Sequence, residues 1–185
     1  LVTRCVLRLQ PKPLTTSTAF VGIDDFQSVP AFLALLDTKL GGGLGAFEVM
    51  WSEYYDFVRD HCPSLKPPLP PNHKYYVVTD ALGSNPEADK DRFEAILETA
   101  HTQGLIQDGV VAQSDKERDD LWAIREGAGE GFRTIAPMFT YDVSMPITVM
   151  DDFATQSMAD IEVAFPGAKT LILGHLGDGN LHAVV

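Results

Sequence analysis

Strand-like and helix-like segments alternate along this chain, and this alternation limits its fold more than any other feature. Ahead of a proline-rich stretch at residues 63–71, strand-like runs at 15–21 and 46–50 enclose a helical segment that ends at three glycines, 41–43. Strand and helix patterns alternate again after the proline-rich stretch. With short links between them, the two halves favour an α+β fold of ferredoxin-like split βαβ units, with a largely antiparallel sheet and helices on one face.

Local signals mark the boundaries of several segments. Residues 3–9 alternate between apolar and basic side chains, which is typical of a half-buried strand. Ser114 followed by Glu117 forms a capping box, so a helix is expected to begin there and to run through Arg125. In the second half the expected strands are 75–82, 108–112, 138–145, 170–175 and 180–185, and the other expected helices are 85–103 and 152–164.

The charge balance argues against several classes of partner. The 185-residue chain has a formal net charge of −12, whereas nucleic-acid binding needs a basic face that releases counterions from phosphates. An anionic membrane surface is disfavoured for the same reason. No apolar run is long enough to span a bilayer, and no signal peptide is recognised. We therefore expect no nucleic-acid partner, no transmembrane segment, and a location in the cytoplasm or at the periphery of a membrane.

The segment at residues 174–182, GHLGDGNLH, carries the clearest chemistry. Asp178-Gly179 between two extended runs is the composition of a two-residue type I′ hairpin turn. Such a turn pairs His175 with His182, and directly opposed side chains share a face with Cβ atoms roughly 4.5–5.5 Å apart. Two imidazoles in that arrangement converge on one divalent ion, although a catalytic ion needs about three protein ligands. An ordinary hairpin with two cross-strand histidines therefore stays open as the alternative.

Arg125 is the candidate for binding an anion. Three glycines follow it within six residues and leave room for another group to approach the backbone. A guanidinium fork matches a carboxylate in a bidentate, charge-assisted pair. A surface arginine paired with Glu126 or Asp120 stays open as the second interpretation.

Five stretches together resemble a known family. TRCVLRLQPKP, GGGLGAFEVMW, LWAIRE, YDVSMP and GHLGDGNLH occur in the order found in the C-terminal, cap domain of FAD-linked oxidases of the vanillyl-alcohol oxidase type. Within that group they are similar to D-2-hydroxyglutarate and D-lactate dehydrogenases. The resemblance implies that residues 1–13 are the tail of a missing FAD-binding domain. Residues 14–185 would then be the FAD-linked oxidase C-terminal domain, truncated before its C-terminal end.

The resemblance also implies roles for individual residues. His175 and His182 would be metal ligands, with zinc as the expected divalent ion, and Arg125 would bind the substrate carboxylate. No catalytic residue is expected in this fragment, because the family's third metal ligand, a glutamate, and its catalytic histidine lie further along the chain. FAD would be bound mainly by the preceding domain, and the residues of this part that contact it are unknown.

The implied activity is that of a flavin-dependent dehydrogenase that oxidises a D-2-hydroxy acid, of the hydroxyglutarate, lactate or glycolate type, to a 2-oxo acid. Its partners would be that small acid and an electron acceptor, with room for a homodimer. The fragment alone is expected to be inactive. A non-catalytic ferredoxin-like module that binds a ligand or a partner is the alternative function, and a metalloprotein without flavin is the third.

The sequence departs from the hydroxyglutarate enzymes at three polar substrate contacts. It has Thr140 in place of a lysine, Val184 in place of an asparagine, and Gly129 in place of a threonine. The case for a dicarboxylate substrate is weaker as a result. D-lactate, glycolate or a larger apolar hydroxy acid is then an equal candidate.

Overall fold

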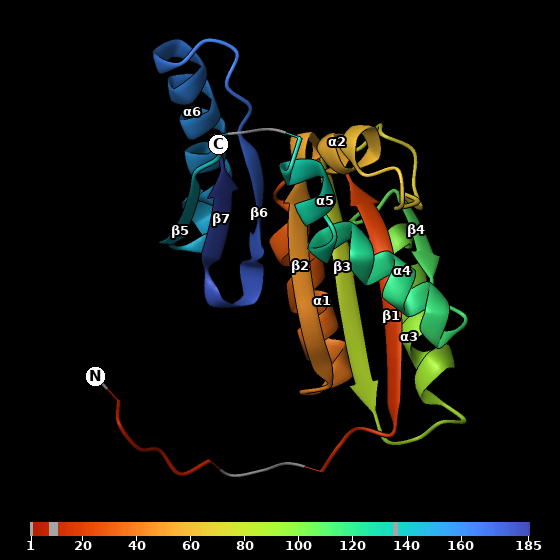
Figure 1. The fold of residues 1–185 in the computed structure, drawn as a ribbon. Coiled ribbons are helices and arrows are strands. Elements are labelled where there is room, and N and C mark those ends of the chain that lie inside the picture. The colour runs from red at the N-terminus through yellow and green to blue at the C-terminus, as the bar shows by residue number, and fades with distance from the viewer. Residues whose placement is uncertain (1, 8–10, 135–136) are drawn as a thin grey trace.

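The computed structural model describes residues 2–7, 11–134 and 137–185. Its strands form one seven-stranded sheet in the order β4-β1-β3-β2-β6-β7-β5, in which every neighbouring pair is antiparallel (Figure 1). The predicted α+β class and largely antiparallel sheet are confirmed. The strands are β1 (Thr15–Ile23), β2 (Leu44–Trp51), β3 (Tyr75–Gly83), β4 (Asp108–Val111), β5 (Thr140–Ser144), β6 (Leu171–His175) and β7 (Asn180–Val184).

Helices cover both faces of the sheet, which differs from the expected single face. The helices are α1 (Ser28–Leu40), α2 (Ser52–His61), α3 (Asp89–Thr102), α4 (Asp115–Glu126), α5 (Gly129–Phe132) and α6 (Met150–Ala164), with short 3₁₀ turns η1 (Ile147–Val149) and η2 (Leu176–Asp178). Ala19 and Val21 of β1 point into a first hydrophobic cluster with α1, α3 and α6, whereas Phe20 points into a second cluster with α2, α4 and α5. The central strands β1 and β3 are buried over continuous runs, and such strands need packing partners on both sides.

Two predicted helix boundaries are confirmed. Helix α1 ends at Gly41, whose left-handed backbone (φ 61°) lets its N–H donate to the carbonyl of Asp37. Helix α4 begins after Ser114, whose hydroxyl accepts from the backbone N–H of Glu117 at 3.2 Å. The second boundary matters for function because it fixes the start of the helix that carries Arg125.

The predicted N-terminal strand is not formed over residues 2–7. This segment has no regular structure, and Val6 and Leu7 are exposed. Residues 8 and 9 of the predicted strand lie outside the described residues. Figure 1 shows the segment running away from the sheet, so its alternating pattern has no neighbouring strand with which to pair.

The sheet has two parts that meet at a short seam. The four-strand part is β4-β1-β3-β2, and the three-strand part is β6-β7-β5, with α6 alongside it (Figure 1). Three residue pairs join β2 to β6, and the pair at one end is Glu48 with His175. Among the described residues, no helix is both long enough and apolar enough to cross a membrane.

Candidate functional site

The hairpin that carries the two histidines has a different register from the predicted one. His175 pairs with Asn180, and His182 pairs with Leu173, so the predicted direct pairing of the two histidines is wrong. The connection is a four-residue loop that contains η2 and ends at Gly179 in a left-handed conformation. Leu176, expected in the strand, is instead fully buried in the first hydrophobic cluster, and this burial favours the wider turn over a two-residue one.

The two imidazoles nevertheless lie side by side. Since strand side chains alternate with a period of two, His182 shares a face with Asn180 and therefore with His175, as a diagonal neighbour. The ring centroids are 4.9 Å apart and the ring planes are nearly perpendicular. The predicted common face is therefore confirmed, although the register that produces it was not predicted.

Each histidine uses the same ring nitrogen to contact a carboxylate. His175 Nδ1 lies 2.5 Å from Glu48 Oε1, and His182 Nδ1 contacts Asp142 Oδ1. A carboxylate that accepts from Nδ1–H leaves the lone pair on Nε2, which is the arrangement that orients histidine ligands in metal sites. The donor set of these two rings therefore fits a divalent cation. No group of three or more His, Cys, Asp or Glu side chains that could hold a metal occurs among the described residues.

Glu48 links the histidine pair to Arg125. Its carboxylate is 10% exposed, with Oε1 at His175 and Oε2 at 3.0 Å from Arg125 Nε. Sequence reasoning assigned Glu48 no role. The available signal was a single acidic residue inside the apolar run AFEVMW, at a position where an unpaired charge would be costly to bury.

Arg125 is not the surface arginine of the second interpretation, which is wrong. Its side chain is only 20% exposed and pairs with Glu48, not with Glu126 or Asp120. One terminal nitrogen, Nη2, lies 3.5 Å from His175 Nε2. Arg125 therefore donates from Nε to Glu48, and its terminal nitrogen Nη2 lies beside the first of the two histidines.

The backbone around Arg125 is fixed by a buried phenol. The hydroxyl of Tyr54 donates to the carbonyl of Arg125 at 2.6 Å. Burial raises the pKa of Tyr54 far above its usual value, more than the nearby Arg125 charge lowers it. The phenol therefore stays protonated and keeps donating at any physiological pH.

The three positions that depart from the hydroxyglutarate enzymes are uncharged, and two of them border this face. Thr140 of β5 lies opposite Val184 of β7, two residues along from the pair Asp142 and His182. Val184 is buried in the second hydrophobic cluster. Open space surrounds the α-carbon of Gly129. These positions therefore offer no charge to a second carboxylate.

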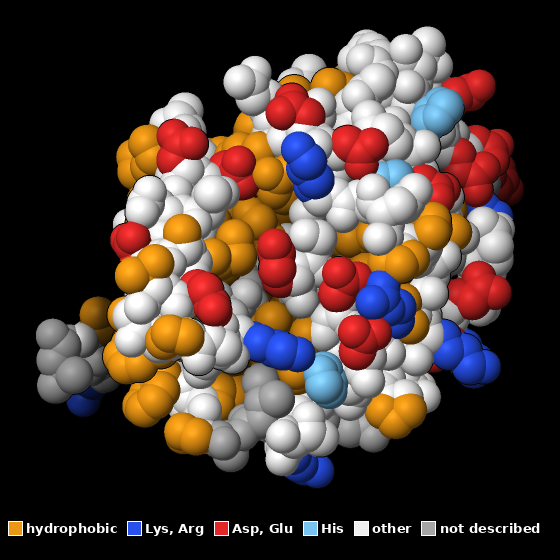
Figure 2. Space-filling view, turned by 90° about the horizontal axis from the view of Figure 1, so that it is seen from above, with side chains coloured by type: hydrophobic (Ala, Val, Ile, Leu, Met, Phe, Trp, Pro, Cys, Tyr) orange, Lys and Arg blue, Asp and Glu red, His pale blue; other side chains and the backbone are white. Residues whose placement is uncertain are grey.

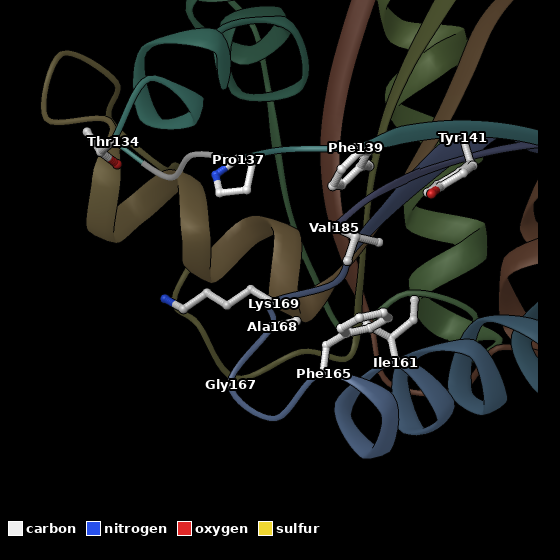
Figure 3. A pocket seen from close by; sticks show the side chains of 10 residues that line it. All are labelled: Thr134, Pro137, Phe139, Tyr141, Ile161, Phe165, Gly167, Ala168, Lys169 and Val185. Carbon is white, nitrogen blue, oxygen red and sulfur yellow. The ribbon is translucent and has the colours of Figure 1, made fainter.

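A wide hollow lies away from these groups. It has a volume of about 870 Å³ and is lined mainly by apolar side chains, among them Phe139, Tyr141 and Phe165, with Lys169 at its edge (Figure 3). From above, hydrophobic side chains gather most densely on the side where α6 lies (Figure 2). A smaller hollow of about 340 Å³ lies directly beside Glu48 and His175. Of these two hollows, the smaller one is lined by Glu48 and His175, and the larger one by none of the site residues described above.

Residues 12–185 match the family model described as "FAD linked oxidases, C-terminal domain". The chain belongs to this family. The match covers all strands and helices of the structure and all the site residues described above. The residues found in three dimensions are thus those of a FAD-linked oxidase C-terminal domain.

Curated relatives of this FAD-linked oxidase domain are named as D-2-hydroxyglutarate or D-lactate dehydrogenases. The chain is 30% identical over 186 residues to a mitochondrial D-2-hydroxyglutarate dehydrogenase of Arabidopsis thaliana, with 98% of the chain and 32% of the relative covered. It is 32% identical over 182 residues to the D-2-hydroxyglutarate dehydrogenase of Xanthomonas citri pv. viticola, covering 98% and 37%. It is 30% identical over 190 residues to a provisionally named mitochondrial D-lactate dehydrogenase of Schizosaccharomyces pombe, covering 98% and 36%. The chain therefore spans about a third of the length of these relatives.

Solved structures share the fold of this FAD-linked oxidase domain at low sequence identity. The 4-ethylphenol oxidase from Gulosibacter chungangensis aligns with a TM-score of 0.59 and 14% identity, covering 96% of this chain and 40% of that one. A p-cresol methylhydroxylase aligns with a TM-score of 0.55 and 10% identity, covering 94% and 39%. At these identities the likeness concerns the fold alone.

Proposed function

We propose that this chain is the substrate- and metal-binding part of a flavin-dependent D-2-hydroxy acid dehydrogenase. The observation that carries the proposal is the cluster of Arg125, Glu48, His175 and His182 on one face of the sheet. An arginine that can bind a carboxylate, next to two histidines that can bind a metal cation, suits a substrate with a carboxylate beside a hydroxyl. The family, and the names of its relatives as hydroxy acid dehydrogenases, support the same assignment.

In this proposal each residue has a defined task. His175 and His182 hold the divalent cation, expected to be zinc, through Nε2, while Glu48 and Asp142 fix the rings through Nδ1. Arg125 binds the substrate carboxylate with its terminal nitrogens. A cation held there would polarise the substrate hydroxyl and so ease the loss of its proton. FAD, bound mainly by a preceding domain to which residues 1–13 would lead, would supply the hydride acceptor for C2.

The uncharged positions favour a monocarboxylic substrate. Thr140, Val184 and Gly129 stand where the resemblance to the hydroxyglutarate enzymes implies three polar substrate contacts. At these positions a second carboxylate would find no charged partner. We therefore place D-lactate, or a D-2-hydroxy acid with a somewhat larger apolar side chain, ahead of D-2-hydroxyglutarate.

The experiment is a substrate panel on the full-length protein with bound flavin. D-lactate, glycolate, D-2-hydroxybutyrate and D-2-hydroxyglutarate are oxidised with a reducible dye as electron acceptor. We expect turnover that a chelator abolishes and added zinc restores, with the two apolar-chain acids ahead of D-2-hydroxyglutarate. No turnover with any of the acids, although flavin is present, would instead support the non-catalytic binding module.

Thr140→Lys tests the substrate class directly. The added ammonium gives a second carboxylate a partner on the strand next to His182. The ratio of kcat/KM for D-2-hydroxyglutarate over D-lactate should rise by at least about tenfold, since a charged hydrogen bond contributes about 1.5–3 kcal/mol. Thr148→Lys, at another position of the same residue type in η1, is the matched control and should leave the ratio unchanged. An unchanged ratio in Thr140→Lys would contradict the assignment of Thr140 to the substrate-binding site.

A further inference from the structure

We propose that Glu48 is a positioning residue that holds the substrate-binding arginine and the first metal ligand in one arrangement. The inference rests on the proposed function and deepens it. Its consequence is that the affinity for the metal and the affinity for the hydroxy acid depend on the same carboxylate.

The position of Glu48 follows from the seam of the sheet. Glu48 lies directly opposite His175 in the pairing of β2 with β6, so both side chains project from the same face. Helix α4 covers that face and brings Arg125 to the other side of the carboxylate. Each oxygen has one partner, Oε1 with His175 Nδ1 and Oε2 with Arg125 Nε. No other side chain of the described site joins the two functional groups.

The carboxylate cannot be replaced by a group of the same size. A glutamine has one acceptor oxygen and an NH₂ group that only donates. If that oxygen accepts from His175, the NH₂ group faces the N–H of Arg125, and two donors oppose each other. The reverse placement sets a donor against His175 Nδ1–H. A buried arginine without its counter-ion is also costly. Glu48→Gln must therefore disturb at least one partner.

The contact between Arg125 and His175 Nε2 adds a link between the two binding events. Nη2 of Arg125 lies 3.5 Å from His175 Nε2. While the lone pair on Nε2 accepts from Arg125, it is not available to a cation. Once Nε2 binds a cation, the arginine fork has to find another acceptor, and the carboxylate of a hydroxy acid provides one. Glu48 holds the arginine and the imidazole in place while the direct contact between them is exchanged for contacts with the substrate and the cation.

The second histidine offers an internal comparison. Asp142 contacts His182 Nδ1 as Glu48 contacts His175, but its side chain is 73% exposed, and within the described part of the chain it makes no hydrogen bond or ion pair with Arg125. Asp142 therefore supports a ligand without reaching the anion anchor. Its removal should weaken metal binding and should affect substrate binding less than removal of Glu48.

The experiment measures two affinities in the full-length flavoprotein. The zinc Kd is obtained by competition with a chelator, and KM at saturating zinc is obtained with the hydroxy acid of the panel that is turned over best. Glu48→Gln should raise the zinc Kd about 10- to 100-fold, the usual effect of removing a carboxylate that supports a ligating histidine. It should also raise KM at saturating zinc. Asp142→Asn should raise the zinc Kd with a smaller change in KM.

Two further variants separate positioning from general damage. Asp80→Asn removes a half-buried carboxylate of β3 that accepts from Thr18 and Trp122, so it should lower Tm but leave zinc Kd and KM unchanged. Glu48→Asp keeps the charge on a shorter side chain that reaches only one partner, and it should restore only one of the two affinities. This variant carries the test if Glu48→Gln does not fold.

The outcomes are distinct. Wild-type zinc Kd and KM in Glu48→Gln, or both affinities at wild-type values in Glu48→Asp, would overturn the positioning role. Failure of the proposed function has another signature, because the wild-type protein itself would then neither bind zinc nor oxidise any acid of the panel.

Discussion

The two parts of the sheet differ in how completely they are packed. In the four-strand part, β1 and β3 pair over nine residues and are buried on both faces. In the three-strand part the strands pair over five residues, and large apolar side chains such as Phe139, Val163 and Phe165 stay exposed. Both hydrophobic clusters extend into the three-strand part, but most of their buried residues belong to the four-strand part and its helices. The four-strand part is therefore the better-packed scaffold, and the three-strand part packs against it along the seam.

The site lies where these two parts meet. Glu48 and Arg125 belong to the four-strand part and its helices, and His175, His182 and Asp142 belong to the three-strand part. A well-packed scaffold holds the anion anchor, and the less covered part brings the cation ligands to it. The site therefore exists only while β6 pairs with β2.

Removal of the ligand at the seam should have the largest effect. His175→Ala in the full-length enzyme deletes a cation ligand and the partner of Glu48. We expect loss of bound zinc and a fall in kcat/KM of more than about 1000-fold, since a catalytic cation contributes several kcal/mol. Metal analysis and steady-state kinetics measure both. A variant that keeps its zinc and its activity would rule out the metal site.

A pair of aromatic truncations compares the packing of the two parts. Phe20 is fully buried between Tyr55 and Tyr76 in the four-strand part, whereas Phe139 is 60% exposed in the three-strand part. Phe20→Ala should lower the free energy of unfolding by about 3–5 kcal/mol. Phe139→Ala should change it by less than about 0.5 kcal/mol. Urea unfolding of each variant measures this free energy. Equal losses in the two variants would mean that the two parts are packed alike.

Arg125→Lys tests the contribution of the scaffold to the site. A lysine keeps the charge but cannot donate to Glu48 and bind a carboxylate with a fork at the same time. The full-length enzyme should lose about 1–3 kcal/mol of transition-state stabilisation in kcat/KM. Unchanged kinetics at unchanged Tm would leave Arg125 with the purely structural role of pairing with Glu48.

The alkaline limit of stability should report on the contact between the two parts, because Tyr75 of β3 donates to Asp151 of α6. Burial raises the pKa of Tyr75, and its hydrogen bond to Asp151 raises it further. The unfolded chain then releases this proton first, near pH 10, so stability is complete below about pH 10 and falls above it. Tyr75→Phe should reduce the slope of that fall by up to about 1.4 kcal/mol per pH unit. Urea unfolding between pH 8 and pH 11 measures the slope, and an identical slope in both proteins would contradict the assignment.

Local sequence determined the strands from residue 15 onward and three residues of the site, Arg125, His175 and His182. The glycines after residue 40 and the Ser114 capping box set helix ends through contacts within a few residues, and such short-range hydrogen bonds are encoded where they form. The strand period of two also placed His175 and His182 on one face even though their register was predicted wrongly. A face depends on parity along the strand, which a shift of two residues preserves.

Only the tertiary structure decided what surrounds the histidines. Glu48 and His175 are 127 positions apart, and Glu48 and Arg125 are 77 apart. No local pattern specifies which strand becomes the neighbour of β6. The same reason explains the missing strand at residues 2–7 and the helices on both faces, since an alternating pattern shows that a segment suits a sheet but not whether a partner is there. Propensity and period act over a few residues, whereas the pairing of β2 with β6 is fixed by the packing of the whole sheet.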